Sequence, residues 1–254
     1  SMTFETFRDT VSQARADGHT HLIVPMHARH SADLLTPVSA FLSLRDPNAQ
    51  AFLFESVEGG EKLARYSFLG RDPYRTLHAT NDGADVTLTT HRSPDRPLSD
   101  DVADGTIFDV LDRLIGRYHE VEIPGLPRLT SGAVGYLGYD TVRLVEDLPE
   151  APPDDLSLPD AVWGFYDTLA AFDHVRHQIV LMASAFVDPD TDLRAAYDDA
   201  QARLDALAAD VTRPPQVDTD FALTDDDMTS TFERDAFETA VRTAKQHIYD
   251  GDIF

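Results

Sequence analysis

The order of apolar and polar residues predicts a series of short strands with helices near both ends of the chain. Phe4, Phe7 and Val11 fall on one helical face, whereas residues 51–90 form short apolar runs between Gly, Asp and Pro turn signals. The predicted strands span residues 21–26, 51–56, 65–69, 74–79, 85–90 and 132–136. The predicted helices span residues 4–15, 106–118, 190–208, a short segment after Thr36-Pro37 and a segment that starts at Ser230. This is the pattern of an antiparallel meander.

Two later apolar runs, residues 161–172 and 178–186, flank a polar turn and predict a long hairpin. Residues 210–229 are rich in Pro, Thr and Asp, so we expect a linker between a first region, 1–209, and a last segment, 230–254. The sequence shows no Gly-rich phosphate loop and no strand–helix–strand alternation, which argues against a doubly wound nucleotide-binding fold.

The last segment carries start and stop signals of a helix. Ser230 and Glu233 have the spacing of a capping box, and Gly251 has the position of the glycine that ends a helix. Ile253 and Phe254 then resemble the first residues of a strand. We therefore expect this sequence to be a truncated part of a longer polypeptide.

The hairpin predicted between residues 52 and 70 concentrates polar groups between apolar strands. An apolar run ends at Glu55-Ser56, crosses Gly59-Gly60 and returns through a run that begins at Arg65. A carboxylate, a hydroxyl and a guanidinium at one end of a hairpin complement a zwitterion such as a free amino acid. The alternatives are structural: a strand-end carboxylate beside a turn hydroxyl, and an ion pair of Arg65 with Glu55 or Glu61 across the hairpin.

Two other clusters have a structural interpretation. Residues 135–140, which include Gly135 and Tyr139, predict close backbone packing and a turn from a strand into a helix. Asp173-His174 has no nucleophile near it in the sequence, so we interpret it as a turn rather than an acid–base pair. None of the ten His has the spacing of a metal motif.

The excess of acidic residues argues against a nucleic-acid-binding protein. The 254 residues include 45 acids (35 Asp and 10 Glu) and 21 basic residues, a formal net charge of −24, and only Lys62 and Lys245 are lysines. A nucleic-acid-binding protein has the opposite balance. The acids are spread along the chain, which favours a solvated surface adapted to high salt over an acidic surface for a basic partner. The absence of Cys excludes disulfides, Cys-ligated zinc and thiol nucleophiles. The absence of a signal peptide and of a long apolar run leads us to expect a cytoplasmic protein that binds neither nucleic acid nor membrane.

Several segments together resemble component I of anthranilate synthase, the chorismate-binding large subunit, and they match the N-terminal half of that family. They are Thr36-Pro37-Val38-Ser39-Ala40-Phe41, Phe54-Glu55-Ser56, Gly60-Glu61, Arg65 to Gly70, Gly132 to Asp140, Leu158-Pro159-Asp160, Phe172-Asp173-His174 and Ile248 to Phe254. The resemblance implies an α+β fold of antiparallel β-sheets packed near-orthogonally with outer helices. The Asp-rich, Lys-poor composition is similar to that of proteins from halophilic archaea.

The resemblance also implies that the first region carries the feedback site for L-tryptophan. Ser56 would contact the bound tryptophan and Glu55 would lie beside it, in reach of its ammonium group. Arg65 would supply the basic group near the site, and Pro37 would belong to the pocket wall. The indole ring needs an apolar surface, for which the sequence offers Phe52, Phe54 and Phe68.

The resemblance implies a full-length lyase that converts chorismate and an ammonia donor to anthranilate and pyruvate. Its cofactor is Mg²⁺, and its partner is a glutamine amidotransferase, component II. In that family the catalytic groups and metal ligands lie in the other half, so we expect none in this chain and no activity from it alone. Two alternatives stay open: the large subunit of aminodeoxychorismate synthase, which shares this architecture, and a stand-alone amino-acid-binding module.

The charge pattern generates a prediction about salt. Self-repulsion among the acids should weaken as the Debye length falls from about 10 Å at 0.1 M salt to about 3 Å at 1 M. We therefore expect the thermal unfolding midpoint to rise steeply with KCl concentration, as followed by circular dichroism. A midpoint that stays flat across this range would contradict the salt-adapted surface.

Overall fold

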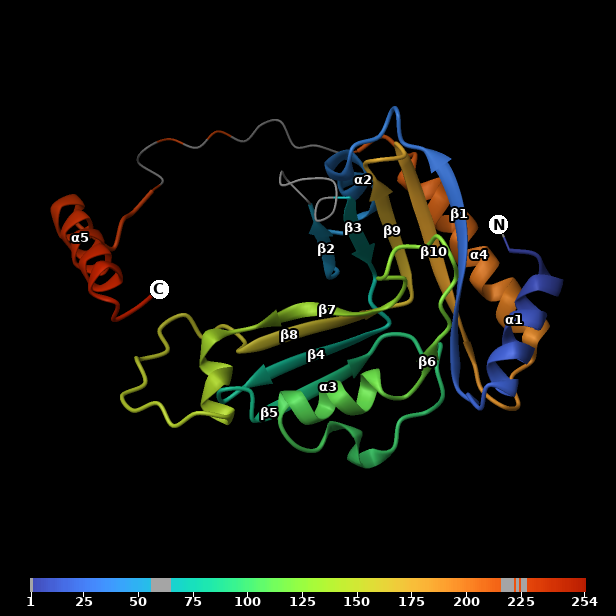
Figure 1. Cartoon of the computed structure of the whole chain (residues 1–254), viewed down its shortest axis with the longest axis horizontal. Coiled ribbons are helices and arrows are strands. Elements are labelled where there is room, and N and C mark those ends of the chain that lie inside the picture. The colour runs from blue at the N-terminus through green and yellow to red at the C-terminus, as the bar shows by residue number, and fades with distance from the viewer. Residues whose placement is uncertain (1, 56–64, 216–221, 223, 225–227) are drawn as a thin grey trace. The chain divides into compact units, whose positions relative to one another are not determined.

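The computed structural model describes residues 2–55, 65–215, 222, 224 and 228–254 (Figure 1). The chain divides into two compact units, Ser1–Gln216 and Val217–Phe254. The first unit contains two β-sheets, and the second contains α5 (Arg234–Asp250). Helix α4 (Leu193–Val211) extends two residues into the segment expected to be a linker.

The larger sheet has six strands in the order β2-β3-β9-β10-β1-β6. Its neighbours are antiparallel except for β1 and β6, which pair in parallel. The β1–β10 pair is the longest, from Leu22 opposite Val187 to Ser31 opposite Gln178. The strands are β1 (Leu22–Ser31), β2 (Ala51–Phe54), β3 (Tyr66–Arg71), β6 (His119–Glu120), β9 (Thr168–Asp173) and β10 (Gln178–Val187).

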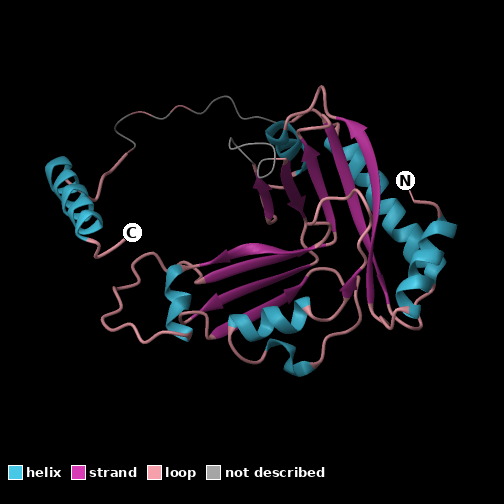
Figure 2. Cartoon of the chain, in the orientation of Figure 1, coloured by secondary structure: helices cyan, strands magenta, loops and turns pink. Residues whose placement is uncertain are grey.

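Helices cover one face of this sheet, as Figure 2 shows. Phe7 and Val11 of the first helix are fully buried, as their spacing predicts, and Leu204 of α4 joins them in one core. The second helix begins after Thr36, as predicted, and Thr36 and Ser39 form a capping box at its start. The covering helices are α1 (Phe4–Ala16), α2 (Pro37–Leu44) and α4.

The smaller sheet has four antiparallel strands in the order β5-β4-β8-β7 and packs against α3 (Ile107–Ile115). A capping box of Thr106 and Asp109 starts α3. The strands of the two sheets cross at a steep angle in Figure 1, and the expected α+β fold with antiparallel sheets is confirmed. The strands are β4 (Arg75–Thr80), β5 (Asp85–Thr90), β7 (Gly132–Leu137) and β8 (Ala161–Tyr166).

The prediction of one strand over residues 161–172 was wrong, because two strands in different sheets occupy it. β8 ends before Asp167 and β9 begins after it. The Asp167 side chain is 2% exposed and pairs with Arg92 at 2.7 Å and with Arg203 at 3.1 Å. A buried carboxylate needs such partners. Asp167 therefore interrupts the apolar run at a position where two arginines can pair with it, and there the chain crosses from one sheet to the other.

One further prediction was wrong in detail, and one short strand was missed. The capping box at Ser230 and Glu233 does not form: α5 begins at Arg234 without a side-chain cap, and the Ser230 hydroxyl lies 2.7 Å from the Phe232 carbonyl. The two-residue strand β6 exists through its pairing with β1, and no apolar pattern marks it. Gly251 does end α5, with a φ of +82°, as predicted.

The predicted close backbone packing at Gly135 is confirmed. A Cβ atom at this position would lie 2.1 Å from the Val162 carbonyl oxygen and 2.7 Å from Trp163 Cα. The chain then leaves β7 through Gly138 and enters the short 3₁₀ helix η2 (Tyr139–Leu144). The glycine therefore serves the contact between β7 and β8.

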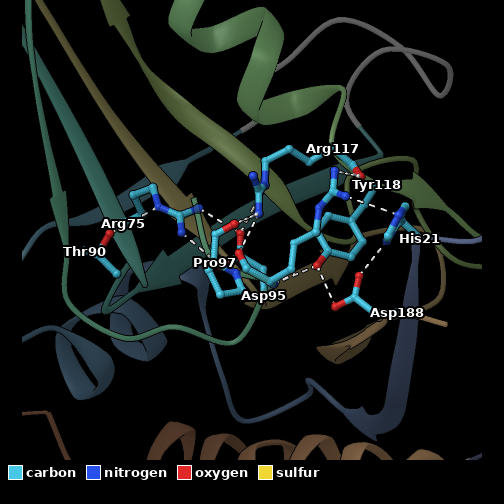
Figure 3. A network of polar contacts seen from close by, with 9 residues as sticks. His21, Arg75, Thr90, Asp95, Pro97, Arg117, Tyr118 and Asp188 are labelled. Atoms are coloured by element: carbon cyan, nitrogen blue, oxygen red, sulfur yellow. Dashed lines mark hydrogen bonds and ion pairs between the residues drawn. The ribbon is translucent and has the colours of Figure 1, made fainter. Parts of the chain in front are cut away.

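A buried charged network holds the segment after β5 in place (Figure 3). Asp95 accepts hydrogen bonds from Arg75 Nη1 at 2.9 Å and Nη2 at 3.0 Å, and Arg117 Nε lies 3.6 Å away. The side chains of Arg75 and Asp95 are each 2% exposed. Nearby, Asp188 at the end of β10 pairs with His21 at 2.7 Å. The network joins the smaller sheet to the segments that flank the larger one.

Replacing Asp95 with Asn should lower the free energy of unfolding by about 3–5 kcal/mol, because it leaves buried guanidinium groups uncompensated. Urea unfolding followed by circular dichroism measures this change. The control is Asp198→Asn, whose exposed pair with Arg194 should contribute less than about 1 kcal/mol. Equal, small losses in both variants would contradict a structural role for the network.

Candidate functional site

Residues of the predicted effector site meet at one end of the six-stranded sheet. Glu55 directly follows β2 and is exposed, and Arg65 directly precedes β3. β2 and β3 are antiparallel, as the hairpin prediction requires, and the register places Tyr66 opposite Asp173 at the end of β9. Ser56 lies outside the described residues. This end of the sheet therefore brings a carboxylate and a guanidinium from the predicted site close to the β9–β10 turn.

Aromatic side chains line one face of the β2–β3 pair at this end. Phe54 lies opposite Phe68, and strand alternation puts Phe52 and Tyr66 on the same face. The ring centroids are 5.2 Å apart for Phe52 and Phe54 and 5.9 Å apart for Tyr66 and Phe68. Phe54 is 52% exposed. The residues expected to offer an apolar surface thus lie together, on the face away from α2.

Arg65 is paired with a residue that the sequence did not suggest. Its Nε donates to Asp173 Oδ1 at 3.2 Å and its Nη2 donates to Oδ2 at 2.7 Å, across 108 residues of sequence. The guanidinium also lies over the Tyr66 ring, 4.9 Å from the centroid. The ion pair considered with Glu55 is therefore replaced by one with Asp173, and Glu61 lies outside the described residues.

The turn after β9 fixes the Asp173 carboxylate. Its Oδ1 accepts from the backbone amides of Val175 and Arg176, each at 3.2 Å, and the side chain is 5% exposed. Burial alone would raise the pKa of Asp173, but the Arg65 guanidinium and the turn amides outweigh it and hold that pKa below its usual value. His174 Nε2 lies 2.7 Å from Ser67 Oγ, which ties the turn to β3.

Sequence reasoning identified Asp173 as a turn residue and missed its contact with Arg65. The turn is confirmed at His174, since residues 174–177 connect β9 to β10, whereas Asp173 is the last residue of β9. No local signal links Asp173 to Arg65. Only the pairing of β3 with β9, which follows from the whole sheet, brings them together.

Pro37 is the first residue of α2, on the helix-covered face of the sheet. The Ala32 amide donates to the His177 carbonyl at 3.0 Å, which ties the segment before α2 to the β9–β10 turn. At the other end of α2, the Leu44 carbonyl accepts a hydrogen bond from Nη1 of Arg71, the last residue of β3. Pro37 therefore lies at the same end of the sheet as Arg65 but behind it, on the side opposite the aromatic face.

Comparison with known proteins identifies the family. Residues 5–254 match the family of chorismate binding enzymes. The chain belongs to that family. Among its relatives, anthranilate synthase component 1 of Acetivibrio thermocellus is 30% identical over 260 residues, which cover 98% of this chain and 50% of that protein. Anthranilate synthase component 1 of Cereibacter sphaeroides is 37% identical over 232 residues, which cover 90% and 46%.

This member of the chorismate-binding family spans about half the length of the curated relatives it matches. A crystal structure of anthranilate synthase component I from Streptococcus pneumoniae TIGR4 aligns with a TM-score of 0.44 and 22% identity, over 87% of this chain and 45% of that one.

The described residues of this chorismate-binding family member contain no group of three or more His, Cys, Asp or Glu placed to hold a metal ion. Within the same residues, every helix is too short or too polar to span a bilayer.

The Asp173 carboxylate should stabilise the fold in a pH-dependent way. Because folding lowers its pKa, its contribution is complete above the unfolded pKa of about 3.9 and is lost as the pH falls through the lower folded value. The free energy of unfolding of the wild type and of Asp173→Asn should therefore differ most above about pH 4 and converge in stronger acid. A difference that is constant from neutral to acid pH would contradict this assignment.

Proposed function

We propose that this chain is the regulatory N-terminal half of an anthranilate synthase component I and that it binds L-tryptophan as a feedback inhibitor. The full-length enzyme is then a lyase that converts chorismate and ammonia to anthranilate and pyruvate. A glutamine amidotransferase subunit, component II, supplies the ammonia. The relatives that bear this name, and the half of their length that the chain spans, support the proposal.

The observation that carries the tryptophan site is the meeting of unlike groups at one end of the larger sheet. Tryptophan presents an ammonium, a carboxylate and an indole ring, and each needs a partner when water is removed. Glu55 offers an acceptor, Arg65 offers donors, and the aromatic face at Phe54 and Phe68 offers a surface for the ring. Ser56, the next residue after Glu55, joins the proposed site by its place in the sequence.

The proposal leaves the chemical step to the rest of the enzyme. Chorismate, the catalytic residues and the Mg²⁺ ligands are assigned to the other half, so the chain by itself should form no anthranilate. Mg²⁺, when bound there, supplies positive charge for the anionic substrate. The acidic composition fits a cytoplasmic enzyme of a halophilic archaeon.

Inhibition through this site is a shift between two states of the enzyme. Tryptophan can reduce activity only by as much as it binds the less active arrangement better than the active one. The proposed site is suited to such a role because it draws on β2, β3 and the β9–β10 turn, and α2 packs on the other face of the same strands. A ligand there acts on several elements at once. Pro37 contributes by setting where α2 begins behind the sheet.

The test uses the full-length enzyme with ammonia and chorismate, with anthranilate fluorescence as the readout. The wild type should form anthranilate and be inhibited by tryptophan, whereas Ser56→Phe should turn over without inhibition because the larger ring fills the site. The control is Ser12→Phe on the exposed side of α1, which should stay inhibited.

Retained inhibition of Ser56→Phe would refute the assigned site. Formation of aminodeoxychorismate in place of anthranilate would refute the assigned reaction. Anthranilate formation by the 254-residue chain alone would refute the assignment of regulation to this chain and of catalysis to the other half of the enzyme.

A further inference from the structure

Among the residues that the structure describes, Arg65 is held by one edge of its guanidinium group, and a second edge has no partner there. A guanidinium has five N–H donors in a planar fork, and two of its edges match a carboxylate. Asp173 occupies the edge formed by Nε and Nη2. Within the described residues no other side chain is hydrogen-bonded to Arg65 or forms an ion pair with it, which leaves the edge formed by Nη1 and the outer Nη2 donor.

The free edge is accessible, and its plane is fixed. The Arg65 side chain is 36% exposed, whereas that of Asp173 is 5% exposed. The Tyr66 ring lies against the guanidinium at 4.9 Å from its centroid. Asp173 therefore anchors one edge and Tyr66 fixes the plane, while the Arg65 side chain as a whole stays partly accessible.

The anchor is itself held rigidly. Two turn amides, of Val175 and Arg176, donate to the Asp173 oxygen that also accepts from Arg65 Nε. The His174 amide donates to the Arg65 carbonyl at 2.9 Å, so the backbone before β3 is tied to the same turn. An arginine restrained in this way loses little further freedom when it binds a ligand.

We propose that Asp173 is a positioning residue that aims the free edge of Arg65 at the carboxylate of the amino-acid effector. The inference rests on the proposed function and adds to it how the carboxylate is recognised. Asp173 fixes the orientation of Arg65, and of these two residues only Arg65 contacts the ligand. A lysine at position 65 could not hold each partner by two parallel hydrogen bonds, because a single ammonium lacks the planar fork.

The experiment measures inhibition of the full-length enzyme, with each variant normalised to its own rate without effector. Asp173→Asn and Arg65→Ala should each raise the half-inhibitory concentration of tryptophan by at least about tenfold, the loss of one charge-assisted hydrogen bond. Their double variant should be no worse than Arg65→Ala, because both act through one contact.

Asp210→Asn is the matched control. Asp210 also pairs with an arginine of β3, Arg71, but at the opposite end of the strand. The Asp210→Asn variant should change the half-inhibitory concentration of tryptophan by less than about twofold. Thermal unfolding of every variant shows which of them fold.

A second readout uses tryptamine, which has the indole and ammonium of tryptophan but no carboxylate. We define the preference as the half-inhibitory concentration of tryptamine divided by that of tryptophan. It should be large for the wild type and should fall in Asp173→Asn and Arg65→Ala. A general loosening of this end of the sheet would instead weaken inhibition by tryptophan and by tryptamine equally, and would leave the preference unchanged. Arg65→Lys, which keeps the charge, should also lose the preference, and it decides the question if Asp173→Asn does not fold.

The outcomes separate this inference from the proposed function. If tryptophan inhibits the wild type and Ser56→Phe relieves it, but Asp173→Asn keeps both inhibition and preference, the positioning role is overturned while the regulatory site stands. Additive effects in the double variant would overturn it as well, since Asp173 would then act apart from Arg65. A wild type that tryptophan does not inhibit would overturn both.

Discussion

The central place of β9 in the larger sheet is the constraint on which the rest of the structure depends. β9 pairs with β3 on one side and with β10 on the other, and Ala170 and Ala171, on its two faces, are both fully buried. Helices can therefore pack on one face while aromatic residues gather on the other. A shift of register by one residue would exchange the two faces and separate Asp173 from Arg65.

Ion pairs between Asp and Arg organise the interior as well as the surface of this acidic chain. Asp95, Asp167 and Asp173 are nearly inaccessible, and each lies against at least one guanidinium. A planar guanidinium can hold a carboxylate by two hydrogen bonds, which a lysine cannot. The shortage of lysine in the sequence thus accords with the geometry of these pairs. Asp210 and Arg71 repeat the arrangement between α4 and β3.

Under the proposed function, regulation and chemistry occupy different parts of one enzyme. The groups proposed to grip the effector come from β2, β3 and the β9–β10 turn, with α2 behind them. These elements belong to one sheet and one core, so a ligand at the sheet end influences the positions of several segments together. Communication with a catalytic half then requires only that the two states of the enzyme differ at this end.

Local signals in the sequence determined the helices and most of the strands. The periodic apolar face of α1, the start of a helix at Thr36-Pro37 and the glycine at 251 are local signals, and the structure has the predicted feature at each. The β2–β3 hairpin and its aromatic face also followed from alternation. Only the tertiary structure decided the partner of Arg65, the crossing between sheets at Asp167 and the strand β6. These depend on contacts between residues far apart in the sequence, whose burial and register no short window of residues contains.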